Sequence, residues 1–258
     1  MNEIFAVASI VIKELYRRKD FYVLFVLTVV ICLLMGSVNI FNDDKIVRYL
    51  KEVCLLFIWI SSLVIAVTTT ARQIPAEREN RTLLPLLAKP LARSRFIIGK
   101  FLGCWVACGL SLVCFYLFFG VLAASREHHF RLVNYVQAMG LHWCMLAVVV
   151  AFALLGSLVF SAPSSNATIS FALIATIMVL GRHLHRFADG LPEPTRSVVA
   201  ALYFIMPHLE LFDVRDLIIH NWPPIGWKVW NLAAVYAFGY AALFVSAACL
   251  CFHRKAIN

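Results

Sequence analysis

The chain has 258 residues, of which 62% are hydrophobic and only 14% charged, and its formal net charge is +9. Soluble domains carry about a quarter charged residues, so a single soluble core of this composition would leave too much apolar surface in water, and lipid is the solvent that fits. The basic residues cluster between apolar runs, as they do in the loops of membrane proteins, which argues against nucleic acid as a partner.

Residues 1–20 are predicted to form an amphipathic helix. Apolar residues recur there at helical spacing, and Lys13, Arg17, Arg18 and Lys19 gather at its end. A basic amphipathic helix that precedes a span usually lies in the cytoplasmic interface. A ragged cytosolic tail is the alternative reading of the same residues.

Six apolar segments are predicted to span the membrane in an all-α, polytopic fold. They are residues 21–41, 53–71, 101–124, 139–161, 167–181 and 228–252. The fifth is short for a full crossing, at about 22 Å of helix. Both termini are predicted to be cytoplasmic, because positive charge is concentrated at the N-terminus and in residues 72–100, beside the first three spans.

Residues 182–226 are predicted to lie on the outer side as re-entrant or interfacial helices. The apolar run 197–206 is too short to cross the bilayer, and Pro207 ends it. Residues 209–219 then alternate polar and apolar residues at helical spacing, which predicts one amphipathic helix. Such a helix would place three acidic residues roughly on one face: Glu210, Asp213 and Asp216.

The charged segment 74–95 between the second and third predicted spans is the most informative part of the chain. Pro75 suits a first helical turn, where Glu77 and Glu79 face the positive end of the helix dipole. Glu77 and Arg81 stand in the favoured order for an ion pair one turn apart. An apolar flank follows, formed by Leu83, Leu84, Leu86 and Leu87. The pattern predicts a short helix lying across the cytoplasmic face of the membrane.

This run, IPAERENRTLLPLLAKPLARSRFIIGKFLG at residues 74–103, resembles the loop between the second and third spans of type-2 ABC exporter permeases. Those loops carry an ERE-x-x-TL-x-x-LLA-x-P-x-x-R pattern, followed by a short apolar stretch and a Gly-Lys pair. The residues that match are Glu77, Arg78, Glu79, Thr82, Leu83, Leu86, Leu87, Ala88, Pro90, Arg93, Gly99 and Lys100. The rest of the chain is similar to that family at lower specificity, as a single permease domain over residues 1–258.

The resemblance implies that residues 74–95 contain the coupling helix, which docks on a separate ATPase subunit and transmits its closure. The implied docking residues are Pro75, Glu77, Arg78, Glu79, Arg81, Thr82, Leu83 and Leu84. The implied supporting residues of the loop are Leu87, Pro90, Arg93 and Lys100. Pro85 interrupts the expected helix, because proline removes a backbone donor and crowds the preceding turn. A positive-inside anchor without docking is the alternative reading.

The chain has no P-loop, since Phe101 rather than Ser or Thr follows the pair Gly99-Lys100. We therefore expect it to bind no cofactor, and the resemblance implies that ATP and Mg are held by another subunit. The resemblance implies the permease of an exporter with two permeases and two ATPases in the inner membrane of a bacterium. The expected partners are an ABC ATPase, a second permease copy or paralogue, membrane lipid and an accessory protein on the outer side.

Two other functions stay open at the level of sequence. A structural or assembly subunit that moves no solute also fits spans with almost no ionisable groups. A membrane-embedded enzyme would need a nucleophile, a metal cluster or an acid/base pair in the bilayer, and the spans show no such arrangement. His183 and His185 could share a metal only on an extended segment. No catalytic or metal site is therefore predicted.

Overall fold

The computed structural model describes residues 2–17, 22–23, 25–30, 33, 44–79, 93–125, 131–189, 192–193 and 195–254. The regular elements within these ranges are all helical. They are α1 (Asn2–Arg17), α3 (Asp44–Ala71), α4 (Gln73–Glu79), α6 (Arg93–Ala124), α7 (Leu132–Val159), α8 (Pro163–Asp189), α9 (Thr195–Ile205), η1 (Leu209–Phe212), α10 (Asp216–Ile219) and α11 (Trp227–Arg254).

Four helical stretches in the described residues are long and apolar enough to cross a membrane: Val47–Glu79, Arg93–Ala124, Leu132–Val159 and Trp227–Arg254. The apolar part of α8, Pro163–Val179, is shorter. Most of the predicted first span, 21–41, lies outside the described residues. The chain is thus an α-helical polytopic membrane protein, and the count of six spans stays a prediction.

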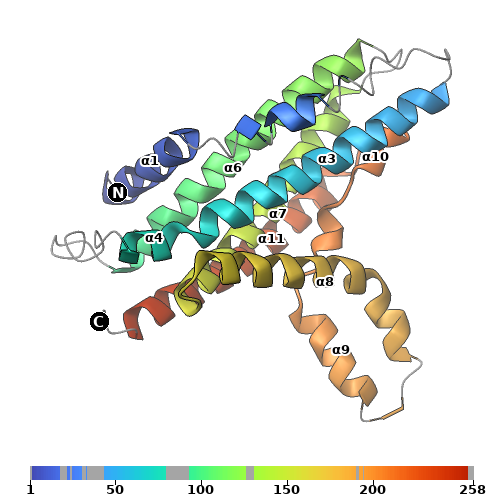
Figure 1. The fold of residues 1–258 in the computed structure, drawn as a ribbon. Helices are drawn as coiled ribbons and strands as arrows, with labels where there is room; N and C mark the ends of the chain where they lie inside the picture. The colour runs from blue at the N-terminus through green and yellow to red at the C-terminus, as the bar shows by residue number, and fades with distance from the viewer. Residues whose placement is uncertain are drawn as a thin grey trace.

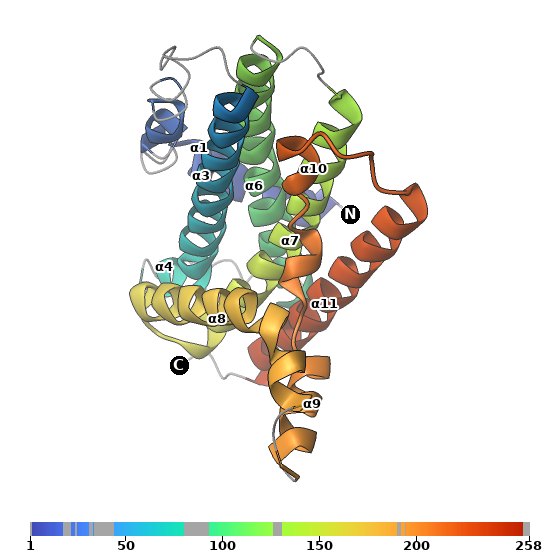
Figure 2. The ribbon, with the colours of Figure 1, turned by 90° about the vertical axis from the view of Figure 1, so that its right-hand side faces the viewer.

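Helix α7 is the centre of the bundle and packs against α3, α6 and α11 (Figures 1 and 2). Every residue from 145 to 151 is at most 2% exposed. In contrast, only 22% of the most apolar 18-residue stretch of α11 is buried. Large apolar side chains such as Leu232 and Val235 are exposed along this helix. A helix of this kind faces lipid or another subunit over most of its surface.

The amphipathic helix α1 lies along the first turns of α6 (Figure 1). Two glycines of α6 make this close approach possible. A Cβ at Gly99 would lie 2.8 Å from Val7 Cβ, and one at Gly103 would lie 2.8 Å from Val11 Cβ. Both distances are below van der Waals contact, so larger residues would push α1 away. The predicted N-terminal helix is therefore docked on the bundle along its apolar side.

Different helices lie at the two ends of the bundle. The start of α1, the helix α4 and the C-terminal end of α11 lie at one end, which we call the α4 end (Figure 1). Helix α10 and the first turns of α3 lie at the opposite end, which we call the α10 end (Figure 1).

The chain before α11 is fastened to the α10 end by buried polar side chains. The Lys51 ammonium donates to the carbonyl of Ile218 at 3.0 Å. Asn134 Nδ2 donates to the carbonyls of Leu217 and Trp222 at 3.0 and 2.9 Å. Lys51 is 2% exposed and Asn134 is 1% exposed, so these hydrogen bonds take the place of water at carbonyls of α10 and of the segment after it.

The single amphipathic helix predicted over residues 209–219 is wrong: the segment is divided into η1 and α10. The backbone leaves helical geometry at Asp213, with φ −83° and ψ 85°. The carboxylate of Asp213 instead accepts two hydrogen bonds from the Arg215 guanidinium, at 2.7 and 2.9 Å. Burial opposes the charged form of Arg215, but the hydrogen bonds and charge of Asp213 outweigh it and raise its pKa above the ordinary value.

Helix α8 begins at Pro163, four residues before the predicted fifth span, 167–181. Asn166 Nδ2 donates to the carbonyl of Ala153 in α7 at 3.0 Å, which fixes this first turn. The helix contacts α3 and α7 and crosses the bundle obliquely near the α4 end, before continuing toward α9 (Figure 2). The start of α8 and the end of α3 thus become neighbours.

Candidate functional site

Helix α4 continues α3 after a one-residue turn at Arg72. The amide of Ala76 donates to the carbonyl of Arg72 at 3.0 Å, so the first turn of α4 is hydrogen-bonded to the residue that joins it to α3. Pro75 lies in the first turn of α4, where the absence of an amide hydrogen costs no helical bond. Ile74 is fully buried and Pro75 is buried beside it. One side of α4 is therefore packed against the protein.

A buried charged cluster joins α4 to α6. The Lys100 ammonium forms an ion pair with Glu77 at 2.5 Å and donates to Gln73 Oε1 at 2.9 Å. The Lys100 side chain is only 4% exposed and that of Glu77 16%. Lys100 Nζ also lies 5.7 Å from the centre of the Phe96 ring. The structure thus brings together Glu77 and Lys100, which the sequence placed in two different groups.

The other side of α4 carries two exposed charged side chains. Arg78 and Glu79 are both exposed, and neither side chain has a hydrogen bond or an ion pair in the part of the chain that the structure describes. Two adjacent charges of opposite sign on a short, anchored helix can recognise a charged partner surface.

Arg93 and Ser94 tie the start of α6 to the end of α11. Arg93 Nη1 donates to the carbonyl of His253 at 3.4 Å, and Ser94 Oγ shares a hydrogen bond with His253 Nε2 at 3.1 Å. Arg93 therefore helps to hold the C-terminal end of α11 beside the start of α6.

Six of the implied site residues lie outside the described residues: Arg81, Thr82, Leu83, Leu84, Leu87 and Pro90. The same holds for Pro85 and for the expected ion pair between Glu77 and Arg81. Their roles stay predictions.

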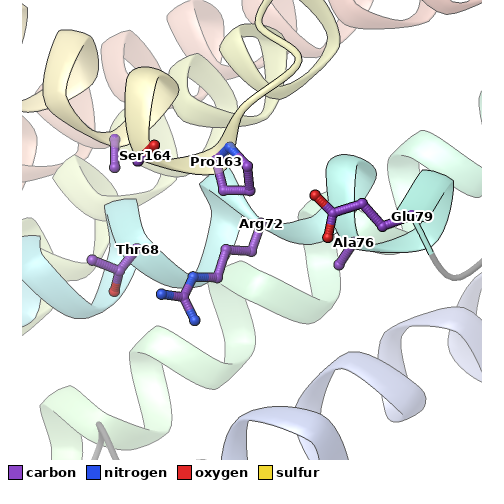
Figure 3. Close-up of a pocket in the computed structure, with 7 residues that line it drawn as sticks. Thr68, Arg72, Ala76, Glu79, Pro163 and Ser164 are labelled. Carbon is purple, nitrogen blue, oxygen red and sulfur yellow. The ribbon is translucent and has the colours of Figure 1, made fainter.

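A pocket of about 440 Å³ opens at the α4 end, between α3–α4 and the first turns of α8 (Figure 3). Figure 3 shows Arg72 and Glu79 on the α3–α4 side and Pro163 and Ser164 across from them. The complete lining is Thr68, Arg72, Ala76, Glu79, Pro163, Ser164 and Ala167. The sequence could not indicate this pocket, because it depends on the crossing of α8 over α3.

His142 is a buried polar residue that the sequence pattern does not set apart from the apolar run around it. It lies in α7, is 2% exposed, and shares a 2.7 Å hydrogen bond with Ser62 of α3. Its other ring nitrogen, Nδ1, has no hydrogen-bond partner in the described structure. Polar groups in the membrane interior usually have a role in packing or in function, and here the pair links α3 to α7.

The geometry defines an α-helical membrane protein with a short anchored helix and a charged surface at one end of its bundle. Residues 5–254 match the family described as ABC-2 family transporter protein, so the chain belongs to this family. It is a permease component of an ABC transporter, a class of membrane subunit that is not itself an ATPase. No curated protein matches the chain.

Proposed function

We propose that the chain is the permease of an ABC exporter, and that α4 docks on a separate ATPase subunit whose ATP hydrolysis moves the bundle. The observation that supports this most is the two-sided character of α4. Its inner side is held by Ile74 and by the ion pair between Glu77 and Lys100, whereas Arg78 and Glu79 are exposed and free among the described residues.

The contacts of α4 offer a route by which a force could enter the membrane helices. Its first turn is hydrogen-bonded to Arg72, the residue that joins it to α3, and its Glu77 and Gln73 hold Lys100 of α6. A partner that displaces α4 therefore acts on α3 and α6 together. Packed helices shift between discrete arrangements rather than deforming continuously, so a small displacement at α4 can be passed along the bundle.

We further propose an assembly of two permeases and two ATPases in the inner membrane of a bacterium, with α4 and both termini on the cytoplasmic side. The exposed apolar surface of α11 offers room for contact with a second permease copy or with lipid. Cargo could be a solute, a lipid or no solute at all if the subunit only transmits force.

A photo-crosslinking experiment tests the docking. A photoreactive amino acid replaces Arg78 in one variant and Arg131 in another. Each variant is co-expressed with the ABC ATPase that is proposed as its partner. Arg131 is the matched control because it is an exposed arginine at the start of α7, toward the α10 end. We expect ATPase crosslinks from position 78 and none from position 131. Equal crosslinking from both, or crosslinking from position 131 alone, would contradict the proposal.

A further inference from the structure

The pocket at the α4 end has an ordered arrangement of polar groups. Thr68, Arg72, Ala76 and Glu79 follow one another at intervals of four, four and three residues, which is the spacing of a single stripe along a helix. Pro163, Ser164 and Ala167 come from the first two turns of α8 and form the opposite wall (Figure 3). A volume of about 440 Å³ is within the usual range for small-ligand pockets.

The pocket holds one positive and one negative side chain that do not neutralise each other. Arg72 and Glu79 are both exposed, and among the described residues neither makes a hydrogen bond or an ion pair through its side chain. They stand about two helical turns apart on the same stripe. Both charges are thus available to a ligand that carries an anionic group and a cationic group.

The depth of the pocket matches that of a lipid headgroup. Arg72 is the first charged residue after the uncharged run 53–71, which is about 28 Å of helix, close to the thickness of the hydrocarbon core. The opposite wall is formed by the first residues of the apolar part of α8, Pro163–Val179. The pocket therefore has the first charged residue after the apolar run of α3 on one wall and the beginning of an apolar helix on the other.

We propose that this pocket binds the headgroup of a zwitterionic phospholipid, with Arg72 holding the phosphate and Glu79 the ammonium. The planar guanidinium forms bidentate hydrogen bonds with phosphate oxygens. The Ser164 hydroxyl, on the opposite wall, adds a donor for the same anion. Val64 and Ile60 stand four and eight residues before Thr68 on the same stripe of α3, half-buried and exposed respectively, and offer apolar surface to the acyl chains.

The lining also predicts which headgroup is preferred. Glu79 repels a lipid with a purely anionic headgroup, such as phosphatidylglycerol. A primary ammonium can donate three hydrogen bonds to a carboxylate, whereas a choline group has no donor and is best bound by aromatic rings. None of the seven lining residues is aromatic. Phosphatidylethanolamine is therefore the lipid that fits best.

Native mass spectrometry of the purified full chain, without any ATPase, tests the proposal. Dioleoyl phosphatidylethanolamine, phosphatidylglycerol and phosphatidylcholine are titrated separately in detergent. We expect phosphatidylethanolamine to bind most tightly. Arg72→Gln is expected to weaken it roughly tenfold, the loss of one charge-assisted interaction, and Glu79→Gln to abolish its advantage over phosphatidylglycerol. Arg131→Gln, the matched control, removes an exposed arginine at the start of α7, outside the pocket lining, and should leave lipid binding unchanged.

Several results would overturn the proposal. Equal affinities for the three lipids, or wild-type affinity in Arg72→Gln with an unchanged unfolding temperature, would show that the pocket does not read the headgroup. Tight binding of glycerophosphoethanolamine, which has no acyl chains, would identify a soluble ligand instead. A cysteine at position 72 can also be labelled with a thiol reagent. If the ATPase without added lipid protects that cysteine from the reagent, the pocket is part of the protein interface. Because the lipid titrations contain no ATPase, their outcome is separate from that of the docking proposal.

Discussion

At the scale of single residues, Lys100 stabilises the α4 end, because its buried charge is balanced by Glu77 of another helix. We predict that Lys100→Ala lowers the free energy of unfolding by about 3–5 kcal/mol, since it leaves the Glu77 carboxylate buried without its cation. The double variant Glu77→Leu/Lys100→Met should recover most of this loss. A double-mutant cycle of unfolding in detergent measures both effects, and strictly additive losses would contradict a direct pair.

The ion pair between Glu77 and Lys100 could not be predicted from the sequence. Helical spacing pairs Glu77 with Arg81, whereas Lys100 is more than twenty residues away and lies at the start of an apolar run. A tertiary contact of this kind has no local pattern. The role of His142 could not be predicted for a similar reason. A single histidine within an apolar segment gives no sign of its hydrogen-bond partner, and Ser62 comes from another helix.

At the scale of elements, the close contact between α1 and α6 depends on Gly103. We predict that Gly103→Leu pushes α1 off the bundle, because even a Cβ there would lie within 3.0 Å of the Ala8 backbone. Backbone amides of α1 should then exchange hydrogen roughly tenfold or more faster. Gly120→Leu, on the same helix with no atom within 4 Å of an added Cβ, is the control and should leave exchange in α1 unchanged.

The apolar runs predicted the cores of the long helices but not their ends. Helix α6 begins at Arg93, before the predicted span 101–124, and α3 begins at Asp44, before the span 53–71. Helical hydrogen bonding continues past the edge of the bilayer, so hydropathy marks only the middle of each helix. The break between η1 and α10 was missed because the side-chain pairing of Asp213 with Arg215 overrides the helical spacing.

The whole molecule has its termini and α4 at one end and α10 at the other, which predicts a sidedness in the membrane (Figure 1). In a variant without native cysteines, a cysteine at position 131 should react with a membrane-impermeant thiol reagent added to intact cells. A cysteine at position 78 should react only after the membrane is opened. Labelling of position 78 in intact cells would place α4 outside and remove the basis for docking.

ATP hydrolysis by the complex, reconstituted in phosphatidylglycerol liposomes that leave the proposed phosphatidylethanolamine site empty, tests whether α4 couples an ATPase to the bundle. We predict that Arg78→Ala and Glu79→Ala each lower the permease-dependent hydrolysis rate about tenfold or more, the effect of losing an interfacial charge contact. Arg131→Ala should hydrolyse ATP at the wild-type rate. Wild-type rates in both α4 variants, with the complex still assembled, would contradict the account.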